Sequence, residues 1–251
     1  MRVGSLLAGC RLVSLVAGMW LAALVAGPAE AQTTAELLAA CQTDTETAAA
    51  RISACTRIIE QMGDEEIRAE AFLQRGVLHE LGGEKEAAIR DYTEAIKIDD
   101  TNSLTFFNRG NAYDQLGQHD LAIADYTQAI KLDPTDPDIY NNRGQTYDGK
   151  GEHDLAIADY TEAIRLDRNN PRPYYNRGLS YANKGDFQRA ITEFDQAIVL
   201  APKDADLRVA RGAANEELGN EEAARADYRK ALEIEPDNED ALEGLSRVGG
   251  S

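Results

Sequence analysis

The sequence lacks the residue clusters on which most enzyme and metal sites depend. It has three cysteines and three histidines in 251 residues, and no cysteine group has the spacing of a metal site. It contains no HExxH segment, no nucleophile elbow and no glycine-rich phosphate-binding loop. We therefore expect no catalytic residue, no metal and no cofactor, and a protein that is not an enzyme.

Positive charge is scarce as well. The 26 Lys and Arg residues are outnumbered by 44 Asp and Glu residues, which gives a net charge of −18 at pH 7. A surface this acidic repels the phosphates of nucleic acid and of anionic membranes, so neither is expected as a partner. The acidity suits the solubility of an elongated molecule, and a partner with basic character is the second interpretation.

Long hydrophobic runs are missing except near the N-terminus. The uncharged apolar run 12–26 is shorter than the roughly 20 residues of a membrane-spanning helix. Ala29-Glu30-Ala31 follows it with the small-x-small pattern of a cleavage site. We predict a signal peptide over 1–31, cleaved after Ala31, and a periplasmic or secreted protein without membrane association. An uncleaved anchor is the alternative.

What the chain does contain is a repeat with a period of 34 residues. An Arg-Gly pair, a second glycine, an alanine and an aromatic residue all return at this step. The Arg-Gly pairs begin at Arg75, Arg109, Arg143, Arg177 and Arg211. Five in-phase copies predict a repeat protein, and the period determines its architecture.

Each copy has the pattern of two helices. In the second copy, Gly117 ends the first helix because a residue without Cβ turns the chain most easily. Asp120 begins an amphipathic second helix, which Pro134 ends. A glycine inside the first helix costs about 1 kcal/mol relative to alanine, a cost that is explained if Gly110 faces Ala122 where the helices nearly touch. One hairpin cannot bury its apolar stripe alone, so successive copies must stack.

This pattern resembles the tetratricopeptide repeat family. The third copy carries the family's packing residues: Tyr140, Gly144, Tyr147, Ala156, Tyr160 and Ala163. The resemblance implies an all-α fold, a right-handed α-solenoid of stacked antiparallel helix hairpins. The five repeats are predicted at 69–102, 103–136, 137–170, 171–204 and 205–238.

The segments on either side of the repeats have their own predictions. Residues 32–68 resemble a degenerate helical hairpin, in which a disulfide between Cys41 and Cys55 suits an exported protein. If the first helix stops at Gln42, Cys55 lies about two turns beyond the bend and the bridge becomes doubtful. Residues 239–251 are predicted to form a capping helix and tail.

An acidic residue lies 16 positions after each repeated arginine. These residues are Asp91, Asp125, Asp159, Glu193 and Asp227. Both positions are equally distant from the hairpin bend, so we predict a repeated ion pair between the two helices; two independent solvated charges are the alternative. Exposed pairs contribute only about 0–1 kcal/mol each, so the expected role is alignment more than stability.

The resemblance also implies a binding surface. In the family, the first helix of each repeat lines a concave groove. The positions carried over to this chain are Leu104, Phe107, Asn111, Asp114, Asp138, Asn141, Gln145, Asp148, Arg172, Tyr175, Leu179 and Asn183. These residues vary among the copies while the packing residues do not, as expected of a binding surface on a constant scaffold.

The chemistry of these positions indicates the kind of partner. Phe107 and Tyr175 are predicted anchors, because aromatic rings supply large contact area at low entropy cost, or else they pack against the neighbouring hairpin. Phe107 and Asp138 stand where the family's carboxylate clamp needs lysine, so a terminal carboxylate is not the expected ligand. Asp114, Asp138 and Asp148 favour a peptide with some basic character.

The predicted function is a non-enzymatic scaffold or adaptor of the cell envelope that binds a partner polypeptide in the concave groove. One alternative is an accessory chaperone or modulator subunit of an envelope enzyme or export machine. Another is a self-associating structural protein, so the oligomeric state stays open.

Overall fold

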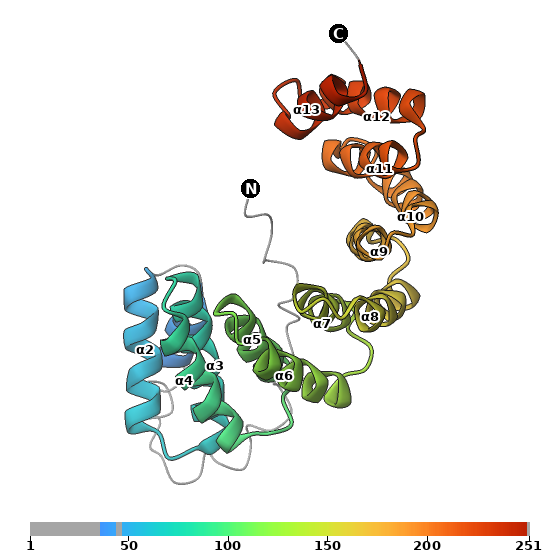
Figure 1. The fold of residues 1–251 in the computed structure, drawn as a ribbon. Coiled ribbons are helices and arrows are strands. Elements are labelled where there is room, and N and C mark those ends of the chain that lie inside the picture. The colour runs from blue at the N-terminus through green and yellow to red at the C-terminus, as the bar shows by residue number, and fades with distance from the viewer. Residues whose placement is uncertain (1–35, 44–46, 250–251) are drawn as a thin grey trace. The chain divides into compact units, whose positions relative to one another are not determined.

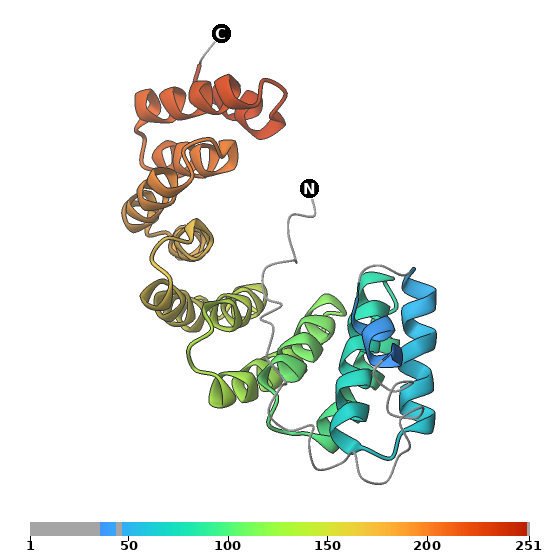
Figure 2. The same cartoon turned by 180° about the vertical axis from the view of Figure 1, so that it is seen from behind.

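A computed structural model describes residues 36–43 and 47–249, and every regular element in those ranges is a helix (Figures 1 and 2). The predicted signal peptide lies outside the described residues. No helix within them is both long and apolar enough to cross a membrane. The chain divides into two compact units, Met1–Arg75 and Gly76–Ser251, with the boundary inside α3 (Glu65–Leu81).

The first unit is held together by the predicted disulfide. Cys41, in a helical segment over 36–42, bonds to Cys55 in α2 (Ala48–Gln61), and their Cα atoms are 5.0 Å apart. The first helix does stop at Gln42, the arrangement expected to make the bridge doubtful. The bridge forms nonetheless, because Cys41 in the last turn of this helix lies beside Cys55 in the middle of α2. Arg51 of α2 donates to the carbonyl oxygens of Cys41 and Gln42, which satisfies two acceptors at the helix end.

The second unit continues with helices that pair into antiparallel hairpins and follow one another in chain order (Figure 1). The helices after α3 are α4 (Lys85–Ile98), α5 (Ser103–Gln115), α6 (His119–Leu132), α7 (Pro137–Gly149), α8 (His153–Leu166), α9 (Pro171–Asn183), α10 (Phe187–Leu200), α11 (Ala205–Glu217), α12 (Glu221–Ile234) and α13 (Glu239–Arg247). Each hairpin packs on the next through its second helix and the following first helix, for example α6 on α7. The predicted all-α solenoid is confirmed.

The helix ends repeat as regularly as the helices. The predicted turn at Gly117 is confirmed, since its φ is +72° and only glycine adopts this region without strain. At the other end, an Asn or Asp side chain accepts hydrogen bonds from the first free N–H groups of α5, α7, α9, α11 and α13. The capping residues are Asn102, Asp136, Asn170, Asp204 and Asn238. These caps also follow the 34-residue step, a signal in the sequence that the helix prediction does not use.

The glycine inside each first helix faces an aromatic ring. A Cβ at Gly110 would lie 2.8 Å from the Tyr126 ring, which is 1% exposed. The nearest neighbour of Gly110 is therefore the Tyr126 ring and not Ala122, the predicted partner, and the predicted close approach of the two helices is present. The ring comes from one turn further along α6 and lies across the glycine, so a flat side chain fills the space between the helices.

The substitution Gly110→Ala is expected to destabilise the protein by about 1 kcal/mol. Overpacking against the buried ring costs roughly 1–3 kcal/mol, and the better helix propensity of alanine returns about 1 kcal/mol. Urea denaturation followed by circular dichroism measures the difference. Gly149→Ala is the matched control, because Gly149 in α7 has open space around its Cβ position and should become slightly more stable. Equal effects of both substitutions would contradict the contact.

Helix α13 covers the last hairpin. It packs on α11 and α12 through Ala241, Gly244 and Val248, which are buried, with Leu245 beside them. Leu242 is 50% exposed, because it lies outside this buried face. The face of α13 that covers the last hairpin therefore consists mainly of residues smaller than leucine.

Candidate functional site

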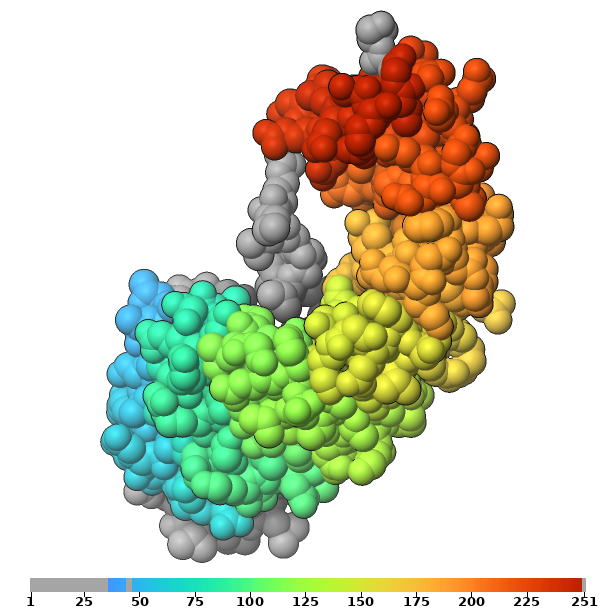
Figure 3. Space-filling model, in the orientation of Figure 1, coloured from blue at the N-terminus to red at the C-terminus, as the bar shows by residue number. Residues whose placement is uncertain are grey.

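The first helices of successive hairpins lie on the inner side of the second unit. α5 contacts α7, α7 contacts α9 and α9 contacts α11, whereas no contact joins α6 to α8 or α8 to α10 in this described part of the chain. The first helices are therefore crowded together, and the second helices diverge on the outer side. Neighbouring hairpins form a continuous surface in the space-filling view (Figure 3). We call the surface of α5, α7 and α9 that faces away from the second helices the inner face.

The predicted groove residues differ in their exposure. Five of them are exposed: Leu104, Asp138, Gln145, Arg172 and Asn183. Six are partly buried: Phe107, Asn111, Asp114, Asp148, Tyr175 and Leu179. Asn141 is only 2% exposed. Only the exposed and partly buried residues of this set can therefore contact a partner.

Two asparagines of this set hold neighbouring hairpins together. The Oδ1 atom of Asn111 accepts hydrogen bonds from the Tyr126 hydroxyl at 2.7 Å and from Asn142 Nδ2 at 2.9 Å. The Oδ1 atom of Asn141 accepts from Asn176 Nδ2 at 2.9 Å. These bonds join α5 to α7 and α7 to α9, so the two residues help set the spacing of the first helices.

Asp148 has a similar structural role. It accepts hydrogen bonds from the Tyr160 hydroxyl at 3.0 Å and from Ser180 Oγ at 2.6 Å, and its other oxygen lies 2.9 Å from His153 Nδ1. Asp114 lies 3.0 Å from His119 Nδ1. The negative charge on the inner face that remains open to a partner therefore comes chiefly from Asp138, which is exposed, and in part from Asp114.

The two predicted aromatic anchors pack against their own hairpins. The ring centroids of Phe107 and Tyr126 are 6.0 Å apart, and those of Tyr175 and Phe194 are 5.9 Å apart. Such tilted pairs are favourable arrangements of aromatic rings. Phe107 and Tyr175 are nevertheless only partly buried, so each presents part of a rigidly held ring at the inner face.

Burial keeps the tyrosine hydroxyls between the hairpins protonated. Desolvation raises the pKa of Tyr92, Tyr126 and Tyr160 well above the ordinary value, and nearby carboxylates such as Asp148 raise it further. The pKa of Tyr228 is raised to about 12, chiefly by burial. Each phenol is therefore a neutral hydrogen-bond donor, which is the state that its bonds to Glu80, Asn111, Asp148 and Glu216 require.

The predicted ion pairs are present in all four hairpins from α5 to α12. Arg109 binds Asp125 through two hydrogen bonds, of 2.7 and 2.8 Å, and its third nitrogen donates to Thr93 of α4 at 3.1 Å. The other pairs are Arg143–Asp159, Arg177–Glu193 and Arg211–Asp227. The expectation that these pairs are exposed is wrong, because the side chains of Arg109 and Asp125 are only 15% and 9% exposed. The pairs lie between three helices, which shield them from solvent.

Sequence models of the tetratricopeptide repeat match residues 69–102, 91–124 and 175–239, and a further model described as a TPR repeat matches 110–151 and 149–185. The chain belongs to the tetratricopeptide repeat family. No curated protein sequence matches it.

Solved structures of tetratricopeptide repeat proteins resemble this one. MamA is 28% identical, with a TM-score of 0.62 over 64% of this chain and 94% of its own. YrrB, described as a TPR protein with an unusual peptide-binding site, is 23% identical, with a TM-score of 0.66 over 78% of this chain and 99% of its own. A tetratricopeptide repeat protein from Parabacteroides merdae ATCC 43184 is 17% identical, with a TM-score of 0.67 over 86% and 99%. The last two likenesses concern the fold alone.

As in the family's pattern, the side chains that repeat in this tetratricopeptide repeat protein serve packing. Within the described ranges, no three His, Cys, Asp or Glu side chains are grouped as ligands for a metal ion. The exposed residues of the inner face, in contrast, form a surface whose chemistry changes from repeat to repeat on a constant frame.

Proposed function

We propose that this protein is a non-enzymatic scaffold that binds a segment of another polypeptide along the inner face. The observation that carries the proposal is the contrast between Leu104, Asp138 and Arg172. They occupy the same place in three consecutive first helices, all three are exposed, and they are apolar, acidic and basic. The residues behind them keep the same packing in every hairpin, so the variation does not serve the fold.

The partner segment has aromatic or apolar contacts and some basic character. Phe107 and Tyr175 offer ring surface that is already held in place, so binding costs little side-chain entropy. Asp114 and Asp138, which lie between Phe107 and Tyr175 in the sequence, supply negative charge. The net charge of −18 also attracts basic segments from a distance. The peptide-binding site named for YrrB supports a similar use of the fold.

The protein acts outside the cytoplasm, in the cell envelope. The Cys41–Cys55 disulfide supports this location, because disulfides persist in oxidising compartments. The signal-peptide pattern over 1–31 is the second support.

Site-specific photocrosslinking tests the proposal. A photoreactive amino acid in place of Phe107 or Tyr175 should capture the same partner chain in the native envelope. The same group in place of Val199, which is 75% exposed on α10, should not capture it. Capture of many unfolded chains at all three sites would instead favour the chaperone alternative.

Charge reversal then tests the chemistry with the purified partner. Asp138→Lys is expected to weaken binding roughly fivefold, because reversing one exposed charge changes the free energy by about 1 kcal/mol. Glu86→Lys is the matched control: Glu86 is exposed at the start of α4, away from the inner face, and its reversal makes the same change in net charge. Calorimetric titration measures both. If both variants lost the same affinity, binding would depend only on net charge, and the proposal that the inner face is the binding surface would be wrong.

A further inference from the structure

The repeated arginines in two hairpins are covered by aromatic rings. The guanidinium carbon of Arg109 lies 5.8 Å from the ring centroids of both Phe106 and Tyr113. Arg143 repeats this arrangement, at 6.0 Å from Tyr140 and 5.9 Å from Tyr147. A guanidinium is attracted to the face of an aromatic ring at such distances. Each arginine thus has carboxylate partners at its edge and rings on its faces.

The last of these arginines, Arg211, has no aromatic residue at the two places from which the rings contact Arg109 and Arg143. The two places that hold aromatic residues in the earlier hairpins hold Arg208 and Asn215 here. A third place, occupied by Leu121 and Leu155 in α6 and α8, holds Ala223. The Arg211 side chain is accordingly 24% exposed, against 15% for Arg109 and 16% for Arg143.

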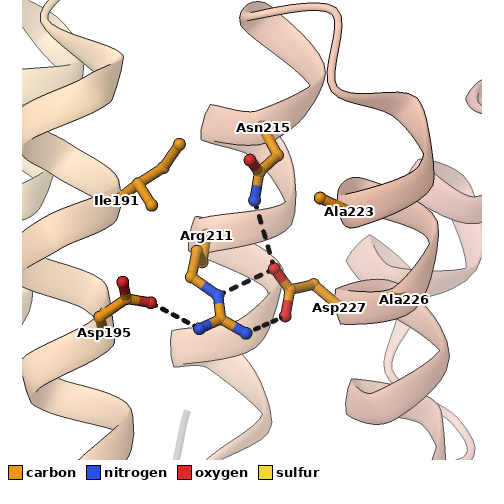
Figure 4. Close-up of a pocket in the computed structure, with 7 residues that line it drawn as sticks. All are labelled: Ile191, Asp195, Arg211, Asn215, Ala223, Ala226 and Asp227. Carbon is orange, nitrogen blue, oxygen red and sulfur yellow. Dashed lines mark hydrogen bonds and ion pairs between the residues drawn. The ribbon is translucent and has the colours of Figure 1, made fainter.

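Asn215 and Ala223, which are smaller than the Tyr and Leu residues at the same places, leave an open pocket. It measures about 260 Å³ and is lined by Ile191, Asp195, Arg211, Asn215, Ala223, Ala226 and Asp227. Figure 4 shows Arg211 and Asn215 on the central helix, with Ile191 and Asp195 on one flanking helix and the remaining three residues on the other. We call it the Arg211 pocket. It lies over α11 between α10 and α12, two second helices, and so on the outer side, away from the inner face.

The chemistry of the Arg211 pocket excludes an anionic ligand. Arg211 already pairs with Asp195 of α10 and Asp227 of α12, and Asn215 also donates to Asp227. A second anion would face two carboxylates without gaining a free cation. Ile191, Ala223 and Ala226 supply apolar walls. A neutral side chain with a flat, polarisable face suits this combination of apolar walls and a guanidinium.

We propose that the Arg211 pocket binds a tyrosine or phenylalanine side chain of a partner polypeptide, which takes the place that Tyr113 and Tyr147 hold in their own hairpins. The partner is a different protein, because no aromatic side chain among the described residues is exposed and able to enter the pocket of a second copy. The inference is independent of the inner face, and either surface can fail its test without the other.

The test is a nuclear magnetic resonance titration of the purified, isotope-labelled protein with N-acetyl-tyrosinamide and N-acetyl-phenylalaninamide. Both should shift the Arg211 Nε resonance and the Ala223 and Ala226 amide resonances in a saturable way. N-acetyl-leucinamide should bind at least about fivefold more weakly, since it cannot stack on the guanidinium. Equal binding of all three probes would overturn the proposal.

Two variants fill the pocket from within. Asn215→Tyr introduces the side chain present at this place in α5 and α7, and Ala223→Leu the one present in α6 and α8. Either should reduce probe binding at least tenfold, and the second serves if the first does not fold. Asn169→Tyr, in an exposed turn, adds the same ring elsewhere and should leave the titration unchanged. Undiminished binding to a folded, filled variant would disprove the site.

Analytical ultracentrifugation tests whether the aromatic ring in the pocket comes from a second copy of this chain. The unmodified protein is expected to sediment as the same species as Asn215→Tyr at all concentrations. A concentration-dependent dimer that Asn215→Tyr abolishes would show that a second copy occupies the pocket, and the assignment to a separate partner would then be wrong.

Discussion

Replacing Tyr160 by alanine is expected to lower the free energy of unfolding by about 4 kcal/mol, within the range for removing a large aromatic side chain from a core. The ring is 1% exposed, and a Cβ at Gly144 would lie 2.7 Å from it, so ring and glycine together set the distance between α7 and α8. Removing the ring leaves a cavity that the two helices cannot close without losing their contacts with α9.

Urea denaturation followed by the helical circular dichroism signal measures this loss. Tyr160→Phe is the matched control, because the fourth repeat naturally has Phe194 at the same place. It should cost only about 1 kcal/mol, the contribution of one hydrogen bond, since Asp148 keeps its bond from Ser180. A Tyr160→Ala protein within about 1 kcal/mol of the parent would mean that the aromatic residues do not determine the hairpin spacing.

Replacing Asp159 by alanine is expected to cost about 3 kcal/mol. This value is at the lower end of the range for breaking a buried ion pair, because the Arg143 side chain is still 16% exposed to solvent. Asp159 accepts two hydrogen bonds from Arg143, at 2.7 and 2.8 Å, and the Thr127 hydroxyl accepts a third. Without Asp159, the shielded guanidinium keeps only the hydrogen bond to Thr127. The positive charge then lacks both a counter-ion and full hydration.

The matched control is Asp154→Ala in the same helix. Asp154 pairs with Lys184 at the surface, with 84% of its side chain exposed, so its removal should change stability little. The double substitution Arg143→Met with Asp159→Leu should recover most of the loss, because it removes the unpaired charge as well as the pair. Thermal and urea denaturation of the three proteins decide the matter. Equal effects of the two single substitutions would show that the Arg143–Asp159 pair is no more than a surface interaction.

The 34-residue pattern predicted the fold because packing within a hairpin is a local matter. Gly144 and Tyr160 lie on two helices joined by a short turn, so their spacing in the chain nearly determines that they meet. The same holds for Arg143 and Asp159, which are equally distant from the bend and form the predicted pair. At Gly110 the nearest neighbour is Tyr126, which lies one helical turn beyond the predicted Ala122, because the large ring reaches further across the space between the helices than a methyl group does.

The roles of the inner-face residues required the tertiary structure. Asn111 bonds to Asn142 and Asp148 to Ser180, across separations of 31 and 32 residues that join different hairpins. Helical periodicity places these residues on the correct face, but it does not give the rotation between neighbouring hairpins that decides which of them meet. Sequence reasoning therefore assigned to a partner some side chains that the stack itself uses.

The amino-acid sequence by itself determined the repeat, the helix pairs and the ion pairs within them, since all depend on contacts between residues close along the chain. Only the tertiary structure decided that those ion pairs are shielded, that Asn141 is buried, and that the loss of two large side chains around Arg211 opens a pocket. The physical reason is that burial is produced by the neighbouring hairpin. Its position depends on the angle between hairpins, which many weak contacts set together.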